Sequence, residues 1–201
     1  MKAIMISIKP KWCAKIMNGE KTIEIRTSKA LYKAIQKLID EYGFAEFYVY
    51  CTKDNKQGLV WDNRGKGLVN SSLFPYGKDC PETYRLVNGK VVFKFRCYNV
   101  EEIYPLLHKP SLFTPVDCLY YLNMGSPKGL KDKACVNYSE LNDYLQHKPG
   151  YAIHINDLEI FDKPKELSEF TNGKYIFGKN YKLELYKLTK APQNFCYVEV
   201  E

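Results

Sequence analysis

The sequence lacks the signatures of several large classes of protein. Its 7 cysteines are scattered without a Cys-x-x-Cys pair, and their number is odd. This pattern is typical of reduced thiols buried as small apolar groups in a cytosolic protein, and it predicts no metal site. A Gly-rich phosphate loop, a serine triad signature and a His-Glu-x-x-His motif are also missing. His154 lies in a predicted apolar strand, where we expect a satisfied core residue.

Long apolar runs are missing as well. The apolar stretch at residues 3–8 is too short for a signal peptide and is followed directly by Lys9 and Lys11. No stretch approaches the length of a membrane span. We therefore expect a cytoplasmic protein with one domain over residues 1–201, with insertions around 28–43 and 101–150.

Basic and aromatic side chains, by contrast, are plentiful. Lys and Arg number 30 against 23 Asp and Glu, which gives a formal net charge of +7, and there are 17 Tyr and 10 Phe. An excess of positive charge favours a polyanionic partner through counterion release, although many proteins carry such a charge for solubility alone. Aromatic residues favour strands and also form stacking surfaces for bases.

Apolar periodicity predicts several strands with few long helices between them. Predicted strands occupy residues 2–8, 45–51, 91–100, 151–161 and 195–199. A short helix is predicted at 139–145, with Ser139 as its N-cap. This pattern fits an α+β fold in which a small mixed β-barrel has helices covering its ends.

A longer helix is predicted at residues 28–43, where an apolar stripe runs from an N-cap at Ser28 to Gly43. Its other faces carry Lys29, Lys33 and Lys37. These lysines either flank the charged strand that precedes the helix or form an ordinary solvated face.

The most informative stretch lies near the start, where a short helix, a tight Asn-Gly turn and a strand follow one another. In that strand Glu24 and Arg26 share one face, and Lys21 lies at the turn. Strict alternation sends Lys21 and Glu24 to opposite faces, so they meet only if the turn or a bulge reorients Lys21.

Two interpretations of these charged residues remain open. A lysine beside a carboxylate can exchange a proton if burial lowers the pKa of the lysine, which makes Lys21 and Glu24 the candidate catalytic pair. An arginine such as Arg26 can hold a phosphate or carboxylate in a bidentate contact. Alternatively, the residues form structural salt bridges, between Glu24 and Arg26 or across to a neighbouring strand.

Further candidate binding residues surround this stretch, and the full set of candidate ligand-binding residues is Lys9, Lys11, Trp12, Thr22 and Arg26. The lysines and Trp12 form a basic and aromatic cluster, which suits stacking and phosphate contacts, unless Trp12 belongs to the core. Residues 62–81 form a predicted loop. Around this loop Trp61, Arg64, Lys66 and Tyr76 make either a clamp for a single strand or an ordinary surface loop.

Three segments of the sequence resemble ASCH domains of the long phage or bacterial form. Residues 7–26 (SIKPKWCAKIMNGEKTIEIR) resemble the opening motif. Residues 151–170 (YAIHINDLEIFDKPKELSEF) and 191–199 (APQNFCYVE) resemble later segments, in the same order. The resemblance implies a PUA-like mixed β-barrel with a groove suited to RNA or a modified base. Residues 171–188 lack the cysteine cluster of some long members, so no metal is carried over.

The opening motif is also similar to that of small ASCH proteins of the N4-acetylcytidine amidohydrolase type, which has the pattern Gly-x-Lys-Thr-x-Thr-x-Arg. Lys21 matches the lysine, Thr22 the first threonine and Arg26 the arginine. Glu24 replaces the second, nucleophilic threonine, and a carboxylate cannot serve as the same nucleophile. Glu24 remains suited to direct a water as a general base.

These observations favour a protein that binds RNA or a modified nucleotide in a charged cleft, without a cofactor, and they leave its oligomeric state open. The alternative is an enzyme, either a hydrolase acting on modified cytidine or a ribonuclease. A third hypothesis is an interaction protein of phage or prophage origin in which the cleft has lost its function.

Overall fold

The computed structural model describes most of the chain, and within it an α+β protein with two compact units. The described residues are 2–54, 58–62, 68–69, 84–106, 119–122, 127–176 and 182–199. Unit 1 comprises Met1–Asn18, Ala45–Arg96 and Asp157–Glu201. Unit 2 comprises Gly19–Phe44 and Cys97–Asn156.

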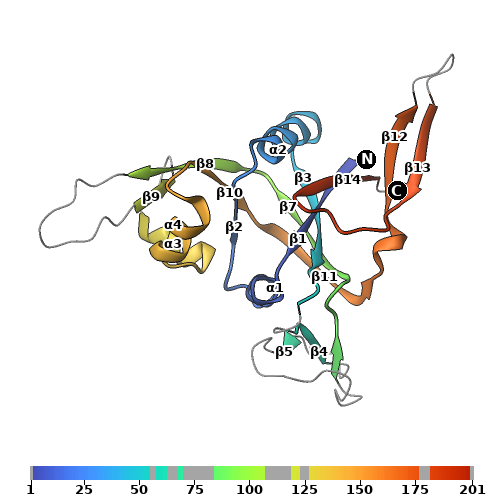
Figure 1. Ribbon diagram of the computed structural model, residues 1–201, viewed down its shortest axis with the longest axis horizontal. Helices are drawn as coiled ribbons and strands as arrows, with labels where there is room; N and C mark the ends of the chain where they lie inside the picture. Colours follow the sequence, from blue (N-terminus) through green and yellow to red (C-terminus); the bar gives the residue numbers. More distant parts are fainter. Residues whose placement is uncertain are drawn as a thin grey trace, which may run out of the picture. The chain divides into compact units, whose positions relative to one another are not determined.

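Unit 1 is built on a seven-stranded sheet in the order β11-β7-β3-β1-β14-β12-β13 (Figure 1). Its strands are β1 (Lys2–Ile8), β3 (Ala45–Cys51), β7 (Val91–Cys97), β11 (Asn156–Lys165), β12 (Thr171–Ile176), β13 (Lys182–Lys187) and β14 (Phe195–Glu199). β1 pairs in parallel with β3 and antiparallel with β14, so the first and last strands of the chain are neighbours in the sheet. The strands predicted at 2–8, 45–51 and 195–199 are confirmed with these bounds.

Smaller elements complete unit 1. They are α1 (Pro10–Met17), β4 (Val60–Asp62), β5 (Leu68–Val69), β6 (Tyr84–Leu86) and the 3₁₀ turn η1 (Leu167–Glu169). β5, β4 and β6 form a three-stranded sheet in that order. In the core, the rings of Phe47 and Phe95 stack with their centroids 4.7 Å apart. This contact joins β3 to β7 through aromatic burial.

Unit 2 is built on a four-stranded sheet in the order β2-β10-β8-β9. Its strands are β2 (Ile23–Arg26), β8 (Val100–Leu106), β9 (Leu119–Leu122) and β10 (Gly150–His154). Its helices are α2 (Lys29–Tyr42), α3 (Pro127–Ala134) and α4 (Tyr138–Leu145). The insertions predicted around 28–43 and 101–150 both fall within this unit, while the single-domain organisation and the barrel closure stay predictions.

The two faces of the unit 2 sheet have different environments. One face buries Ile23, Ile25 and Ala152 in a core with apolar side chains of α3 and α4. Because side chains alternate along a strand, the opposite face carries Glu24 and Arg26 of β2 and their partners on β10. Glu24 and Arg26 therefore leave β2 on the side opposite to Ile23 and Ile25.

Helix caps decide where two of these helices begin and end. As predicted, the Ser28 side chain accepts a hydrogen bond of 3.2 Å from the Leu31 N–H, and Gly43 ends α2 with φ of +80°. The predicted cap of α4 is wrong, because Asn137 rather than Ser139 caps this helix. The Asn137 side chain accepts from the Glu140 N–H at 2.8 Å, and the Glu140 carboxylate accepts from the Asn137 N–H at 3.1 Å. This reciprocal pair is a capping box.

Two long predicted strands are each divided into strands of different sheets. The strand predicted at 91–100 ends at Cys97, and β8 of the other sheet starts at Val100. The strand predicted at 151–161 is interrupted at Ile155, and the left-handed φ of +46° at Asp157 follows closely. At both places the chain passes from one unit to the other, which the local alternation pattern does not reveal. Among the described residues, none of the helices has the length and hydropathy needed to cross a membrane.

Candidate functional site

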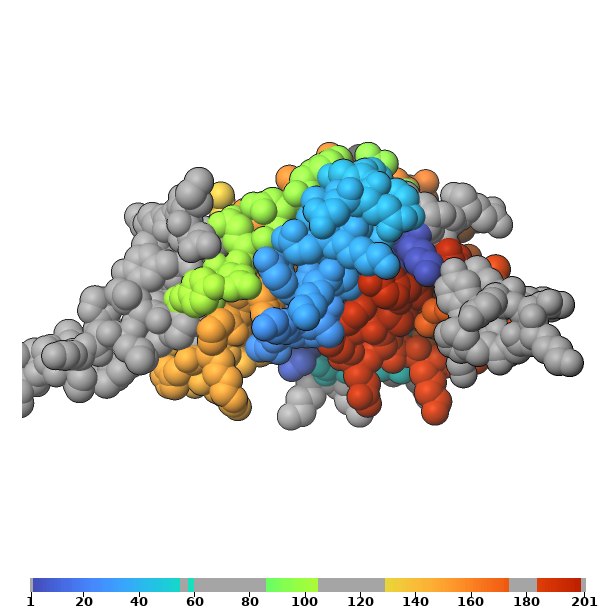
Figure 2. Space-filling view, turned by 90° about the horizontal axis from the view of Figure 1, so that it is seen from above, coloured from blue at the N-terminus to red at the C-terminus, as the bar shows by residue number. Residues whose placement is uncertain are grey.

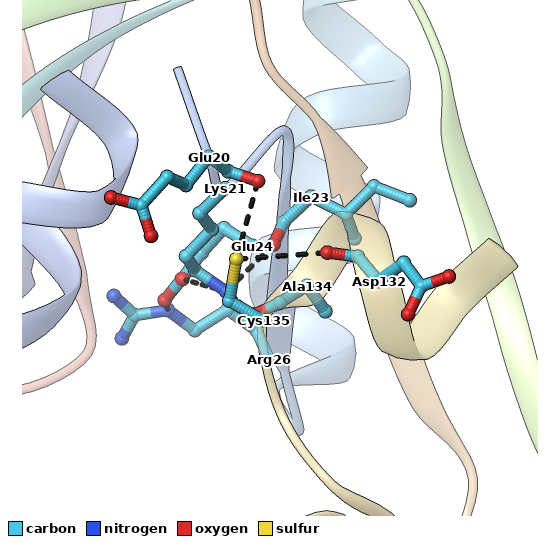
Figure 3. Close-up of polar contacts among 8 residues, drawn as sticks. All are labelled: Glu20, Lys21, Ile23, Glu24, Arg26, Asp132, Ala134 and Cys135. Carbon is cyan, nitrogen blue, oxygen red and sulfur yellow. Dashed lines mark hydrogen bonds and ion pairs between the residues drawn. The ribbon is translucent and has the colours of Figure 1, made fainter. Parts of the chain in front are cut away.

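A buried group of three charged side chains lies at β2. The Nζ atom of Lys21 is 3.3 Å from Oε2 of Glu24, and Nε of Arg26 is 3.0 Å from Oε1 of the same carboxylate (Figure 3). The side chains of Lys21, Glu24 and Arg26 are 3%, 10% and 13% exposed. Glu24 thus bridges two cations, and the group keeps one positive charge in excess.

The turn before β2 explains how Lys21 reaches Glu24. Lys21 precedes the first residue of the strand, so strand alternation does not apply to it. Its Nζ atom also donates to the carbonyl oxygens of Ile23 at 2.7 Å and Ala134 at 2.9 Å. An ammonium has three N–H donors, and three acceptors surround this one, so each donor has an acceptor at this buried position.

The end of α3 holds this turn in place through further contacts. The Thr22 N–H donates to the carbonyl of Lys133 at 2.8 Å. The Cys135 thiol donates to the carbonyls of Glu20 at 3.2 Å and Asp132 at 3.6 Å (Figure 3). Cys135 itself has a left-handed φ of +56°. The role of Cys135 at this turn was not predicted, because the thiol and its acceptor Glu20 are 115 positions apart in the chain.

Arg26 is oriented by Glu24. Its Nε atom faces the carboxylate, and its two terminal nitrogens point away from it (Figure 3). The half-exposed Tyr144 of α4 lies near it. Burial raises the pKa of Tyr144 and the Glu24 charge adds to this, whereas Arg26 and a hydrogen bond with Thr27 lower it. The Arg26 guanidinium and the Tyr144 ring therefore lie near each other in unit 2.

A row of tyrosines continues from Arg26 across the sheet. Tyr151 of β10 is the cross-strand neighbour of Arg26 on one side and of Glu102 on the other. The Tyr32 ring of α2 stacks on the Tyr151 ring with centroids 4.7 Å apart and planes at 20°. Tyr104, which is 45% exposed, donates to the Glu102 carboxylate, and this hydrogen bond raises the pKa of Tyr104. The row joins α2, β10 and β8, and no single stretch of sequence signals it.

The other candidate binding residues lie in different places. Lys9, Lys11 and Trp12 belong to unit 1, at the start of α1, whereas Thr22 is exposed on unit 2. The Nζ atom of Lys11 is 4.4 Å from the centroid of the half-buried Trp12 ring, a cation–π distance. Lys9 is exposed at the N-cap of α1.

The loop predicted to clamp a ligand falls mainly on residues that the structure does not describe. Arg64, Lys66 and Tyr76 lie outside the described residues, and only the backbone of Trp61 is described, in β4.

Titratable groups elsewhere in unit 2 form one further pair. The Nε2 atom of His154 lies 2.6 Å from Oε1 of Glu101, so this histidine has the partner expected of it, at a partly exposed position. Nearby, burial raises the pKa of the Cys97 thiol to about 12, which makes it a poor nucleophile. Within the described ranges, no three His, Cys, Asp or Glu side chains are grouped so that they could hold a metal ion.

Comparison with models of protein families and with curated protein sequences finds no match. Among solved structures, the chain is similar to three crystal structures of an ASCH protein from Zymomonas mobilis, each 14% identical to it. The match to one mutant of that protein has a TM-score of 0.46 and covers 98% of this chain and 88% of that one. A second mutant gives 0.43 with 83% and 77% covered, and the ASCH protein itself gives 0.39 with 82% and 73%. No residue role in this chain follows from these likenesses.

Proposed function

We propose that this chain is an ASCH-type protein of PUA-like fold that binds RNA or a modified nucleotide, and that Arg26 is its main phosphate contact. The bridging position of Glu24 carries this proposal. The ion pair places Nε of Arg26 3.0 Å from the Glu24 carboxylate, and the two terminal nitrogens of the guanidinium point away from that carboxylate. A guanidinium fork that is already oriented loses little freedom when it binds a phosphate, and its flat geometry matches two phosphate oxygens.

The charge and the aromatic neighbours of Arg26 support a nucleic-acid ligand. The buried group contains two cations against one carboxylate, and the whole chain has a formal net charge of +7. Tyr144 and Tyr104 present half-exposed rings on the same unit. Stacking on an aromatic ring contributes roughly 1–3 kcal/mol per base, so a phosphate contact with one ring beside it suits a nucleotide.

Unit 1 supplies a second group with the same chemistry. Lys9, Lys11 and Trp12 combine basic and aromatic side chains on α1, and we propose that they contact the same class of ligand.

The enzyme hypothesis remains the alternative, and the direct contact between Lys21 and Glu24 is the observation that favours it. In a hydrolase or ribonuclease one of the two residues must take up a proton. However, the Lys21 ammonium already donates to two backbone carbonyls and contacts Glu24, and Glu24 already contacts two cations, so both side chains are engaged in contacts within the protein. The geometry therefore supports binding better than proton transfer.

The test is a titration of labelled single-stranded RNA with the wild-type protein, Arg26→Gln and Arg26→Lys. We expect Arg26→Gln to lose most of the affinity and Arg26→Lys to recover only part of it, because lysine keeps the charge but not the fork. Wild-type affinity should fall steeply between about 50 mM and 200 mM salt. Equal affinity of the three proteins, or an affinity that does not change with salt, would contradict the proposal.

A further inference from the structure

The exposed side of α2 carries a shallow depression that is wide open to solvent, which we call the hollow. Among the described residues it is lined by Tyr32, Lys33, Gln36, Lys37, Asp40 and Glu41. These positions repeat every four residues, so they share one side of the helix. The light blue surface of α2 faces the viewer in Figure 2. The described lining of the hollow thus belongs to α2 of unit 2.

Tyr32 connects this hollow to Arg26. The Tyr32 ring lines the hollow and also stacks on Tyr151 at a centroid distance of 4.7 Å. Tyr151 is in turn the cross-strand neighbour of Arg26, and neighbouring strands lie about 4.8 Å apart. The connection through the chain is equally short, because α2 begins three residues after Arg26. A ligand held at Arg26 therefore has an aromatic surface and a hollow next to it.

The charged side chains of α2 change from basic to acidic along the helix. Lys29, Lys33 and Lys37 are exposed and follow one another at intervals of four residues, a rise of about 6 Å between successive lysines. The acidic residues of the hollow, Asp40 and Glu41, come only in the last turns of the helix. The lysines thus begin near Arg26 at the N-terminal end of α2, and the acidic residues lie at its C-terminal end. This order suits a chain of phosphates that starts at Arg26.

We infer that this hollow is a second subsite for single-stranded nucleic acid. A nucleotide adjacent to the one at Arg26 places its base against Tyr32 and its phosphate at Lys33 and Lys37. The inference rests on the proposed function and narrows it, because the ligand is then a strand of linked nucleotides and not a single nucleotide.

The experiment compares two probes, uridine monophosphate and a single-stranded oligouridine of about ten nucleotides, which is within the usual site size of a single-strand binding domain. The test variant is Lys33→Gln with Lys37→Gln, and the matched control is Lys131→Gln with Lys148→Gln, two exposed lysines of unit 2 outside α2. We expect the test variant to bind the oligouridine about tenfold more weakly than the wild type does. The plot of log affinity against log salt concentration should also be less steep by about 1.4, which corresponds to two lost phosphate contacts. The affinity of the test variant for uridine monophosphate should equal that of the wild type.

Tyr32 is tested separately because its ring also packs on Tyr151. Tyr32→Phe keeps a stacking ring and should bind the oligouridine as the wild type does, whereas Tyr32→Leu should bind it more weakly. Melting temperatures of both variants report whether the fold is intact. Full affinity of a folded Tyr32→Leu variant would overturn the base contact.

Two further outcomes would reject the subsite along α2, and a third would reject the proposed function. If the α2 lysine variant binds oligouridine like the wild type while Arg26→Gln does not, the hollow is no subsite and the proposed function stands. An equal loss in the Lys131 and Lys148 control would show a general charge effect and also overturn the inference. If the wild type binds neither probe, the proposed function itself is wrong.

Discussion

The Lys21 ammonium donates a 2.9 Å hydrogen bond to the carbonyl oxygen of Ala134, which lies 113 positions further along the chain. This bond joins the turn before β2 to the end of α3, and the same ammonium also holds Glu24. The position of the charged face of β2 thus depends on a helix from a distant part of the sequence. Lys21 consequently has a structural role in addition to any chemical one.

Replacement of Lys21 by Met should destabilise the protein strongly. The variant leaves the buried carbonyls of Ile23 and Ala134 and the Glu24 carboxylate with one partner fewer. Removal of one partner from a buried charged group typically costs about 3–5 kcal/mol, and we expect about 3 kcal/mol because Arg26 still pairs with Glu24. Urea denaturation measures the free energy of unfolding.

The control for this prediction is Lys131→Met, which changes an exposed lysine of α3. Its free energy of unfolding should stay within about 0.5 kcal/mol of the wild type, as for most surface substitutions. A similarly small change for Lys21→Met would mean that the three acceptors contribute little to stability.

The cap of α4 offers a comparison between two nearby positions. Asn137→Ala removes the side chain that accepts from the Glu140 N–H, and it should lower the free energy of unfolding by about 1 kcal/mol. Ser139→Ala is the matched variant, because Ser139 lies within the helix and is exposed, and it should change stability by less than about 0.5 kcal/mol. If Ser139→Ala proved the more harmful of the two, the helix would begin at the position predicted from its sequence.

Stability at alkaline pH should depend on Tyr48. Burial, followed by the charge of Glu46 and a hydrogen bond with it, raises the pKa of Tyr48 from its ordinary value of 10.0 to about 12. The unfolded chain therefore loses this proton at a lower pH than the folded protein does. The contribution to stability is complete below pH 10 and is lost as the pH rises towards 12, by an amount of about 3 kcal/mol.

Unfolding in urea at several pH values between about 9 and 12 checks this dependence. Tyr48→Phe should reduce the fall in stability over that range, whatever its effect at neutral pH. Tyr98→Phe changes an exposed tyrosine and should leave the slope as in the wild type. An unchanged slope in Tyr48→Phe would show that Tyr48 does not titrate late in the folded protein.

The enzyme hypothesis leads to a prediction about turnover. Because Lys21 and Glu24 are already engaged with each other, with Arg26 and with the carbonyl of Ala134, we expect no product from N4-acetylcytidine or single-stranded RNA above the background of Lys21→Met. Chromatography of the reaction mixtures after long incubation measures this. Product formed by the wild type and lost in a folded Lys21 variant would instead support a hydrolase or a ribonuclease.

Local signals in the sequence were sufficient for much of the secondary structure. The bounds of α2 were predicted because Ser28 and Gly43 act on backbone groups within one turn of themselves. β1, β3 and β14 were predicted because apolar side chains and β-branched residues recur over a few neighbouring positions. The capping box of α4 is equally local, since Asn137 precedes Glu140 by three positions, but the predicted cap was Ser139.

The candidate site was predictable only as a list of residues. The opening motif pointed to Lys21, Glu24 and Arg26, and whether each contacts a ligand stays a prediction. The alternation of residues along β2 left open whether Lys21 and Glu24 meet. In the structure Nζ of Lys21 lies 3.3 Å from Oε2 of Glu24, because α3 supplies a carbonyl that orients the lysine. The row of tyrosines was not predicted, since Tyr32 and Tyr151 come from α2 and β10 and meet only in the folded unit.

The sequence by itself determined the excess of positive charge, the caps of α2 and the alternation of β2, because each depends on residues that are neighbours in the chain. Tertiary structure alone decided the division into two units at Cys97 and Asn156, the burial of Lys21 and the hollow along α2. These features depend on which distant segments pack together. A sequence of 201 residues specifies such packing through many weak contacts at once and not through any single motif.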